Sequence, residues 1–370
     1  MLAHIVGQEL AVAVLDQALK NEASHAYLFS GPKGAGKTDA ALAFAAGLAC
    51  PTHGCAVCDT CGRVLRGIHP DVQVVSPDGV SILVDQVREI NQEVSLRPFE
   101  ARARCYVILE AETMNERAAN AFLKTLEEPP GYVHFILVTN APERVLSTIA
   151  SRCQRVQFSR LSAATLVAYL TDFLEVPDAQ ADVLARVTQG NLGYAQSLAT
   201  SEEARARRER IMGWARAIPE SSMAGLERIL DEIMDSSEDE AGRVAAGLEA
   251  QCERDLEWAP DSRARNRVEK AWAQRVKRER RRVSGDVLAE VRTVFAYWYR
   301  DMAAVAMGAD ESVCNYDYLF ELQREGTVSQ VPAYLDAVRV TQRAEELFRY
   351  NVDARCALED MLLSMKEALR

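Results

Sequence analysis

The sequence predicts an α/β domain built on a parallel sheet, followed by an all-helical region. Short apolar β-type runs alternate with helix-like segments over about the first 160 residues, and such alternation favours parallel strands covered by helices on both faces. The β-type signal stops after Phe158, and from about Ser201 to the end the pattern is helical. At 370 residues the chain is too long for one core, so two or three domains are expected.

The expected elements follow in chain order. His25–Ser30 is an aromatic-rich apolar run that stops at Gly31, which predicts a buried strand. The next segment, Lys37–Leu48, is rich in alanine and predicts a helix. Three more β-type runs and one helix come next: Val72–Val75, Cys105–Leu109, the helix Asn115–Leu126 and Phe135–Thr139. Three helices are then expected, at Ser162–Glu175, at Ala179–Thr188 and opening at Gly190–Gly193.

Composition and charge exclude several functional classes. The start of the chain lacks a signal-peptide pattern, and no apolar stretch reaches the roughly 20 residues that a membrane-spanning helix needs. A cytoplasmic location without membrane contact is therefore expected. The formal net charge is −11, which disfavours sequence-independent binding to DNA, because phosphate contacts need an excess of Lys and Arg. Any role near DNA is expected to run mainly through other proteins.

Charge is sorted along the helical region. Residues 220–257 carry 12 acidic and 3 basic residues, whereas residues 261–283 carry 10 basic and 3 acidic residues. The basic run Lys277–Arg282 could contact DNA phosphates, or it could be a solvated helix face paired with the acidic segment before it.

A phosphate-binding loop follows the first predicted strand. Residues 31–38 read G-P-K-G-A-G-K-T and fit G-x-x-x-x-G-K-[ST] between a strand and a helix. Glycines let backbone N–H groups curl around a phosphate, and the helix N-terminus adds partial positive charge. Lys37 is expected to reach the β and γ phosphates and Thr38 to ligate Mg²⁺, with Gly31, Gly34 and Gly36 shaping the loop. A turn that only joins two elements would leave Lys37 and Thr38 unexplained.

The acidic partner of this loop is incomplete. A second strand should end in a carboxylate that holds Mg²⁺, often with a Glu beside it that polarises water. In the run Tyr106–Glu112, Leu109 takes the metal-holding position and Glu110 the water-activating one. The alternative is a register shifted by one residue, with Glu110 serving the metal. On either interpretation one carboxylate is missing, so ATP with Mg²⁺ is expected to bind weakly or statically, with slow hydrolysis or none.

Four of the nine cysteines form a metal-binding pattern. Cys50, Cys55, Cys58 and Cys61 have the spacing C-x4-C-x2-C-x2-C, and four thiolates can enclose a tetrahedral Zn²⁺ with no open position, which is typical of a structural site. A redox C-x-x-C pair is the rival interpretation, but such a pair needs no further cysteines at this spacing. The other five cysteines are expected to be buried core thiols.

Several motifs resemble those of bacterial DNA polymerase III clamp-loader subunits, which are AAA+ proteins. Asn120–Pro130 is similar to the family's N-A-L-L-K-T-L-E-E-P-P signature, and Phe135–Asn140 resembles its sensor-1 strand. Ser151-Arg152-Cys153 matches its S-R-C motif, and Val6-Gly7-Gln8 its N-terminal adenine-side box. A zinc knuckle after the phosphate-loop helix is typical of the same group. The C-terminal half resembles the family mainly in its helical character.

The resemblance implies an AAA+ P-loop domain at 1–160 with a zinc module at 50–61, a helical lid at 161–200 and a helical collar at 201–370. Within the family, the delta-prime branch is favoured over the tau/gamma motor. His69-Pro-Asp71 and Asp85–Arg88 resemble delta-prime segments, Leu109 replaces the motor's acidic residue, and Gly193 stands where the motor has a sensor-2 arginine. The intact phosphate loop departs from those delta-prime proteins that have lost it.

The resemblance also implies roles and partners. Arg152 would act as an arginine finger in trans on the ATP of a neighbouring subunit, unless it only pairs with a local carboxylate. Thr139 or Asn140 would be a γ-phosphate sensor. Expected partners are the tau/gamma and delta subunits in a heteropentamer, the sliding clamp and, indirectly, primed DNA. The alternatives are a tau/gamma-type motor ATPase and another AAA+ class that forms a homo-hexamer.

Overall fold

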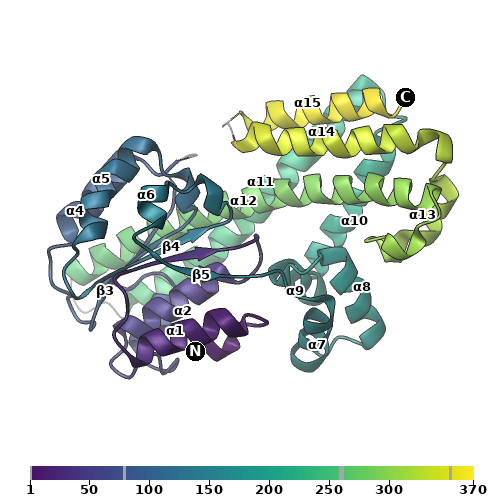
Figure 1. Cartoon of the computed structure of the whole chain (residues 1–370). Helices are drawn as coiled ribbons and strands as arrows, with labels where there is room; N and C mark the ends of the chain where they lie inside the picture. Colours follow the sequence, from purple (N-terminus) through teal and green to yellow (C-terminus); the bar gives the residue numbers. More distant parts are fainter. Residues whose placement is uncertain (1, 78–80, 258–261, 350–351) are drawn as a thin grey trace. The chain divides into compact units, whose positions relative to one another are not determined.

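The computed structural model describes residues 2–77, 81–257, 262–349 and 352–370 (Figure 1). The chain divides into two compact units, each described here by itself. The first comprises Met1–Thr165, Gly190–Gly193 and Asp255–Arg275, and the second comprises Leu166–Gln189, Tyr194–Arg254 and Val276–Arg370. The expected division into 1–160, 161–200 and 201–370 stays a prediction.

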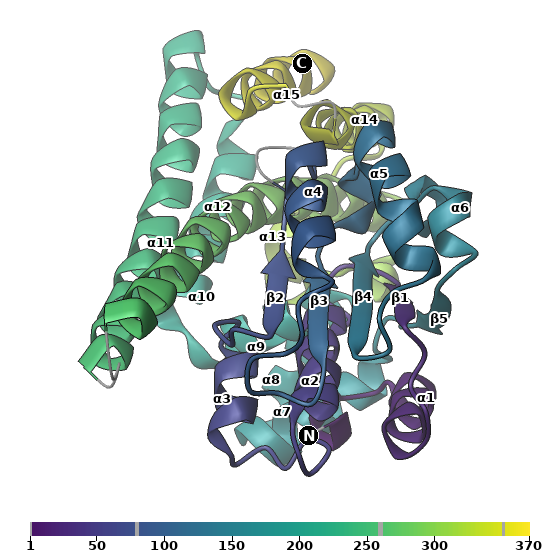
Figure 2. The same ribbon diagram turned by 90° about the vertical axis from the view of Figure 1, so that its left-hand side faces the viewer.

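The first unit is built on a five-stranded parallel sheet in the order β2-β3-β4-β1-β5. Figure 2 shows the strands side by side in this order. The strands are β1 (Ala26–Ser30), β2 (Val72–Val75), β3 (Arg104–Ile108), β4 (Val133–Thr139) and β5 (Gln154–Gln157). The four strands that the apolar runs predict are confirmed. The sequence did not predict β5, because only Val156 of its four residues is buried.

Helices cover both faces of this sheet. They are α1 (Glu9–Lys20), α2 (Lys37–Ala49), α3 (Asp59–Leu65), α4 (Val84–Glu93), α5 (Glu116–Glu127) and α6 (Ser147–Ala150). Side chains of a strand alternate between its two faces. On β1, Tyr27 and Phe29 pack with residues of α1, α2 and α3, whereas Ala26 and Leu28 pack with residues of α4, α5 and α6. The predicted α/β class is therefore confirmed.

The second unit is helical throughout the residues that the structure describes. Its core joins buried residues such as Trp298, Phe295 and Tyr299 on α12 with Ile211 on α10 and Met361 on α15. The helices from residue 163 onward, several of which extend into both units, are α7 (Ala163–Leu174), α8 (Asp178–Thr188), α9 (Leu192–Thr200), α10 (Glu202–Ala217), α11 (Met223–Glu257), α12 (Ser262–Ala306), α13 (Leu319–Glu325), α14 (Val331–Arg349) and α15 (Ala354–Ala368). In the described ranges, no helix is long and apolar enough to cross a membrane.

Short 3₁₀ turns complete the structure, at η1 (Leu2–His4), η2 (Ala111–Thr113), η3 (Pro142–Arg144), η4 (Asp310–Ser312), η5 (Tyr316–Tyr318) and η6 (Val328–Gln330). Of these, η2 follows β3 and η3 follows β4, so both lie at the end of the sheet formed by the carboxyl ends of the parallel strands.

A buried carboxylate organises the chain that leads into β3. Asp71 is 2% exposed, and its side chain accepts hydrogen bonds from the backbone N–H groups of Phe99, Glu100 and Ala101 at 2.7–2.9 Å. Burying a charge is costly unless hydrogen bonds replace its hydration. Within the His69-Pro-Asp71 segment, the N–H of Asp71 donates to His69 Nδ1 at 3.1 Å. The segment therefore has a structural role, because it holds the backbone that leads into β3.

Replacing Asp71 should destabilise the fold strongly. Asp71→Ala leaves three backbone donors without their acceptor, and we expect a loss of about 3 kcal/mol in the free energy of unfolding. Urea denaturation followed by circular dichroism measures this change. Asp85→Ala is the control, because its carboxylate pairs with Arg88 while 80% exposed, and it should change stability by no more than about 0.5 kcal/mol. Equal losses in the two variants would contradict the proposed role of Asp71.

Candidate functional site

The phosphate loop joins β1 to α2 and is shaped by close contacts that only glycine allows. Gly31 has φ 150°, and a Cβ there would lie 2.3 Å from the carbonyl oxygen of Phe158. Gly34 has φ 80°, and a Cβ there would lie 2.2 Å from Asn191 Oδ1. The side chain of Asn191 therefore lies against the loop. Asn191 was not predicted as a site residue, because the sequence pattern marks Gly190–Gly193 only as a helix start.

Lys37 is held inside the curve of the loop. Its ammonium donates to the carbonyl oxygens of Gly31 at 2.7 Å and Pro32 at 2.6 Å, and the residue is 5% exposed. Burial lowers the pKa of Lys37 to about 8, and the charge of Glu112 partly offsets this effect. Thr38 follows, exposed in the first turn of α2. The loop thus has a buried cation and an exposed hydroxyl where the motif predicts them.

The ends of three strands meet beside this loop. In the parallel register Ser30 of β1 lies opposite Thr139 of β4, and Leu137 of β4 lies opposite Ile108 of β3. Thr139 is fully buried, and its hydroxyl accepts a hydrogen bond from the N–H of Ala141 at 3.0 Å. The candidate sensor is therefore placed next to the strand that leads into the phosphate loop.

The acidic segment after β3 contains a further carboxylate near the phosphate loop, Glu112, which the sequence analysis did not single out. Leu109 is half-buried and packs against the core shared with α2, so its side chain offers no ligand for Mg²⁺. Glu110 is exposed in the left-handed region, with φ 51°. Glu112 instead acts on Lys37, and its Oε1 accepts from the N–H of Asn140 at 3.2 Å. Glu112 was not singled out from the sequence because it lies two positions beyond Glu110. The turn η2 brings its charge near Lys37.

Gln8 connects the start of the chain to the phosphate loop. Its side chain is 4% exposed. Nε2 donates to the carbonyl oxygens of Ser159 at 2.8 Å and Ala35 at 3.3 Å, and Oε1 accepts from the N–H of Ser159 at 3.0 Å. The Val6-Gly7-Gln8 segment therefore lies beside the phosphate loop.

Arg152 lies at the opposite end of the sheet, where the parallel strands begin. Strands β1 and β5 are parallel, with Tyr27 opposite Gln154 and Ser30 opposite Gln157. The phosphate loop follows the end of β1, whereas Arg152 comes two residues before β5 begins. A four-residue strand spans about 13 Å. The guanidinium donates to Glu127 Oε1 through Nε at 2.8 Å and through Nη2, and to the carbonyl oxygen of Thr148 through Nη1 at 2.9 Å.

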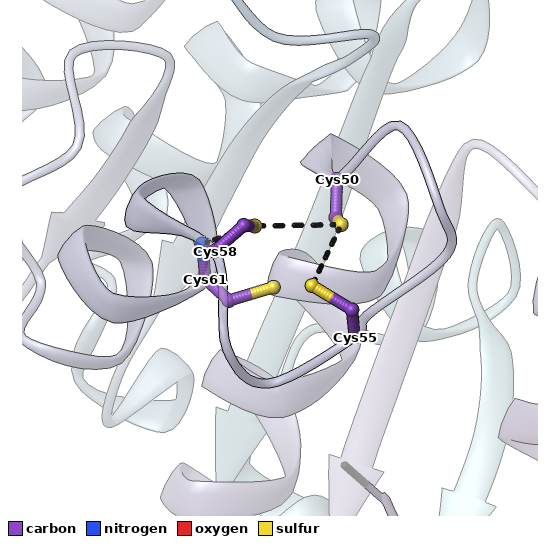
Figure 3. A group of neighbouring side chains, drawn as sticks. All are labelled: Cys50, Cys55, Cys58 and Cys61. Atoms are coloured by element: carbon purple, nitrogen blue, oxygen red, sulfur yellow. Dashed lines mark hydrogen bonds between the residues drawn. The ribbon is translucent and has the colours of Figure 1, made fainter.

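The four cysteines of the predicted module point toward one another between the end of α2 and the start of α3 (Figure 3). Their sulfur atoms all lie within 4.8 Å of one another. Cys50 Sγ lies 3.9 Å from Cys55 Sγ and 3.7 Å from Cys58 Sγ. Sulfur ligands about 2.3 Å from a tetrahedral Zn²⁺ are separated by about 3.8 Å, so the donor set and its spacing fit such an ion.

The surroundings of the sulfur atoms are unequal. Burial acts to raise the pKa of Cys50, but hydrogen bonds from the Thr52 hydroxyl and nearby backbone N–H groups outweigh it and lower that pKa to about 5. Burial raises the pKa of Cys61 to about 12. The structure therefore favours a thiolate at Cys50. The remaining cysteines lie outside this cluster; Cys105, Cys153 and Cys314 are buried as expected, whereas Cys252 is half-buried and Cys356 exposed.

The basic run on α12 lies in the second unit. Lys277, Arg280 and Arg281 line an open pocket of about 230 Å³ together with Glu238, Ala241 and Ser284. Arg282 pairs along its own helix with Glu279 and Asp286, each at 2.8 Å. Contact of this run with DNA stays a prediction.

Comparisons with known proteins find similarity mainly in the N-terminal region. Residues 7–162 match the family model for "DNA polymerase III, delta subunit". The chain is 39% identical over 187 residues to the DNA polymerase III subunit delta′ of Bacillus subtilis, covering 50% of this chain and 56% of that protein. It is 36% identical over 207 residues to the tau subunit of the same organism, covering 52% of this chain and 36% of tau.

The chain thus spans about half, or less, of the length of these relatives. Among solved structures, a gamma subunit-related protein from Thermotoga maritima aligns over 97% of this chain and 99% of its own, with a TM-score of 0.44 and 17% identity. Residues 7–162 are thus similar in sequence to subunits of DNA polymerase III, and this region contains the parallel sheet and the phosphate loop described above.

Proposed function

We propose that this chain is a delta-prime-type clamp-loader subunit that helps to load the sliding clamp onto primed DNA. In this role it gives Arg152 to the ATP site of a neighbouring tau/gamma-type subunit. The observation that carries the proposal is the position of Arg152, which lies at the opposite end of the sheet from the chain's own phosphate loop. An arginine at that end is suited to act on a neighbour's nucleotide, where a guanidinium offsets the charge that develops on the transferred phosphoryl group.

The chain's own nucleotide site supports a static role. The loop with Lys37 and Thr38 has the groups that bind ATP phosphates and Mg²⁺. Hydrolysis also needs a carboxylate at the end of β3, and Leu109 occupies that position with its side chain packed in the core. Against the lowering by burial, the charge of the Glu112 carboxylate raises the pKa of Lys37. We therefore propose that ATP binds here and is turned over slowly or not at all.

A tau/gamma-type motor is the second candidate. The intact phosphate loop favours it, as does the 36% identity to the tau subunit of Bacillus subtilis. A motor of this type predicts measurable ATP hydrolysis by the isolated chain, whereas a delta-prime-type subunit predicts slow hydrolysis or none. The two candidates therefore differ in the ATP turnover of the isolated chain.

The four-cysteine module is proposed to hold a structural Zn²⁺. Cys50, Cys55, Cys58 and Cys61 would be its ligands, and the ion would supply a cross-link between the end of α2 and the start of α3. Four thiolates leave no position for water or substrate, so we assign the module no catalytic step. Arg63 attaches α3 to the neighbouring loop through Glu100 at 2.7 Å, the loop whose backbone Asp71 holds.

The proposed partners are the tau/gamma and delta subunits in a cytoplasmic heteropentamer, and through them the clamp and primed DNA. The similarity to both delta′ and tau supports membership of such an assembly. The net charge of −11 supports contact with DNA through these partners.

The finger assignment predicts which variant stops ATP turnover in the assembled complex. Arg152→Ala should lower turnover by roughly 10³-fold at the neighbour's site, the lower end of the effect of such fingers, whereas Lys37→Ala should leave it nearly intact. Steady-state turnover of the complex with clamp and primed DNA measures both. Arg155→Ala, an exposed arginine three residues away, is the control. Loss of turnover with Lys37→Ala alone, together with hydrolysis by the isolated chain, would instead identify a motor.

Nucleotide binding should weaken as the pH rises through about 8. The ammonium of Lys37 must be charged to bind phosphates, and its pKa is lowered to about 8 by burial. The charged form is therefore present below that pH and is lost above it, so the Kd for a fluorescent ATP analogue should increase about tenfold between pH 7 and pH 9. In Lys37→Arg the charge persists throughout this range, and its Kd should stay flat. A wild-type Kd that does not change would count against this role of Lys37.

The purified protein should contain about one zinc ion per chain, which elemental analysis measures. Cys61→Ser should lose the metal and lower the thermal midpoint by about 5 °C, the shift that roughly 1–2 kcal/mol produces in a domain of this size. Cys356→Ser, an exposed cysteine outside the module, should change neither value. Full zinc content in Cys61→Ser would disprove the ligand set.

A further inference from the structure

The guanidinium of Arg152 is occupied by one carboxylate in this structure. Nε and Nη2 both donate to Glu127 Oε1, and Nη1 donates to the carbonyl oxygen of Thr148. The arginine side chain is 36% exposed and the glutamate side chain 47% exposed. The finger therefore lies at the surface with its donors directed at groups of its own chain.

Local structure places the carboxylate there. Glu127 is the last residue of α5, which ends before Pro129 and Pro130. The C-terminus of a helix carries partial negative charge from its unpaired carbonyl groups. Arg152 follows α6, which packs against α5 in the same core. Helix end and carboxylate together form an anionic corner that favours a cation, and Arg152 fills it.

We propose that Glu127 is a positioning residue for the finger. Its carboxylate holds the guanidinium of Arg152 while the neighbouring site lacks a γ-phosphate, and it gives up the guanidinium when that phosphate arrives. This inference rests on the proposed function of Arg152. A carboxylate and a phosphate both accept paired hydrogen bonds from the planar guanidinium, so the two anions compete for the same donors.

The exposure of the pair sets the size of this competition. Exposed ion pairs contribute little to stability, because water screens both charges. The exchange is therefore reversible, and removing the charge of Glu127 should strengthen the neighbour's apparent affinity for ATP only about two- to fivefold. A buried pair would have locked the arginine in place.

A purely structural role makes a different prediction. If Glu127 only fastened the end of α5 to α6, its replacement would lower the thermal midpoint of the isolated chain and leave the affinity of the complex for ATP unchanged. The positioning role instead requires that the effect of Glu127 depend on Arg152, because the carboxylate acts on the nucleotide through that side chain alone.

The test is a steady-state comparison of the assembled complex carrying Glu127→Gln, Arg152→Ala or both. Glutamine keeps one acceptor but removes the charge. We expect Glu127→Gln to lower the KM for ATP about two- to fivefold while kcat changes less than about twofold. In the Arg152→Ala background the same substitution should change neither parameter. Glu128→Gln, the exposed neighbouring residue, is the matched control and should behave as wild type.

Three outcomes would overturn the proposal: an unchanged KM in Glu127→Gln, an equal shift in Glu128→Gln, or the same shift in the absence of Arg152. Failure of the proposed function is a separate result. If Arg152→Ala leaves turnover intact, the finger itself is disproved and Glu127 has nothing to position. If Arg152→Ala stops turnover but Glu127→Gln leaves KM unchanged, only the role of Glu127 is wrong.

Discussion

The parallel arrangement of the five strands is the constraint on which the two candidate activities depend. All strands of a parallel sheet begin at one end of the sheet and finish at the other. Residues that follow strands therefore lie at the opposite end from residues that precede them. The phosphate loop follows β1, Glu112 follows β3 and Thr139 ends β4, whereas Arg152 precedes β5. A chain of this topology has the phosphate loop at one end of the sheet and Arg152 at the other.

Sequence reasoning captured the parts of this arrangement that rest on burial or on fixed spacing. The apolar runs of β1, β3 and β4 are buried on both faces, which makes their signal strong. The glycine spacing identified the phosphate loop, and the cysteine spacing identified a cluster whose sulfur atoms do converge. The edge strand β5 was missed because its other residues, Gln154, Arg155 and Gln157, are exposed and polar.

What the sequence did not reveal depends on contacts between distant segments. Against the lowering by burial, the charge of Glu112, in the 3₁₀ turn after β3, raises the pKa of Lys37. Asn191 contacts Gly34 across more than 150 residues of chain. The partner of Arg152 was foreseen only as some local carboxylate. Only the packing of α5 and α6 identifies it as Glu127.

One rigid element joins the two candidate binding sites of the first unit. Helix α2 begins at Lys37 and is followed directly by Cys50, so a single 13-residue helix, about 20 Å long, runs from the phosphate loop to the cysteine module. If the cysteine module holds the proposed Zn²⁺, a coloured ion such as Co²⁺ in its place would lie at one end of this helix while nucleotide occupied the other. The module then offers a built-in optical probe of the nucleotide site, with no label attached to the protein.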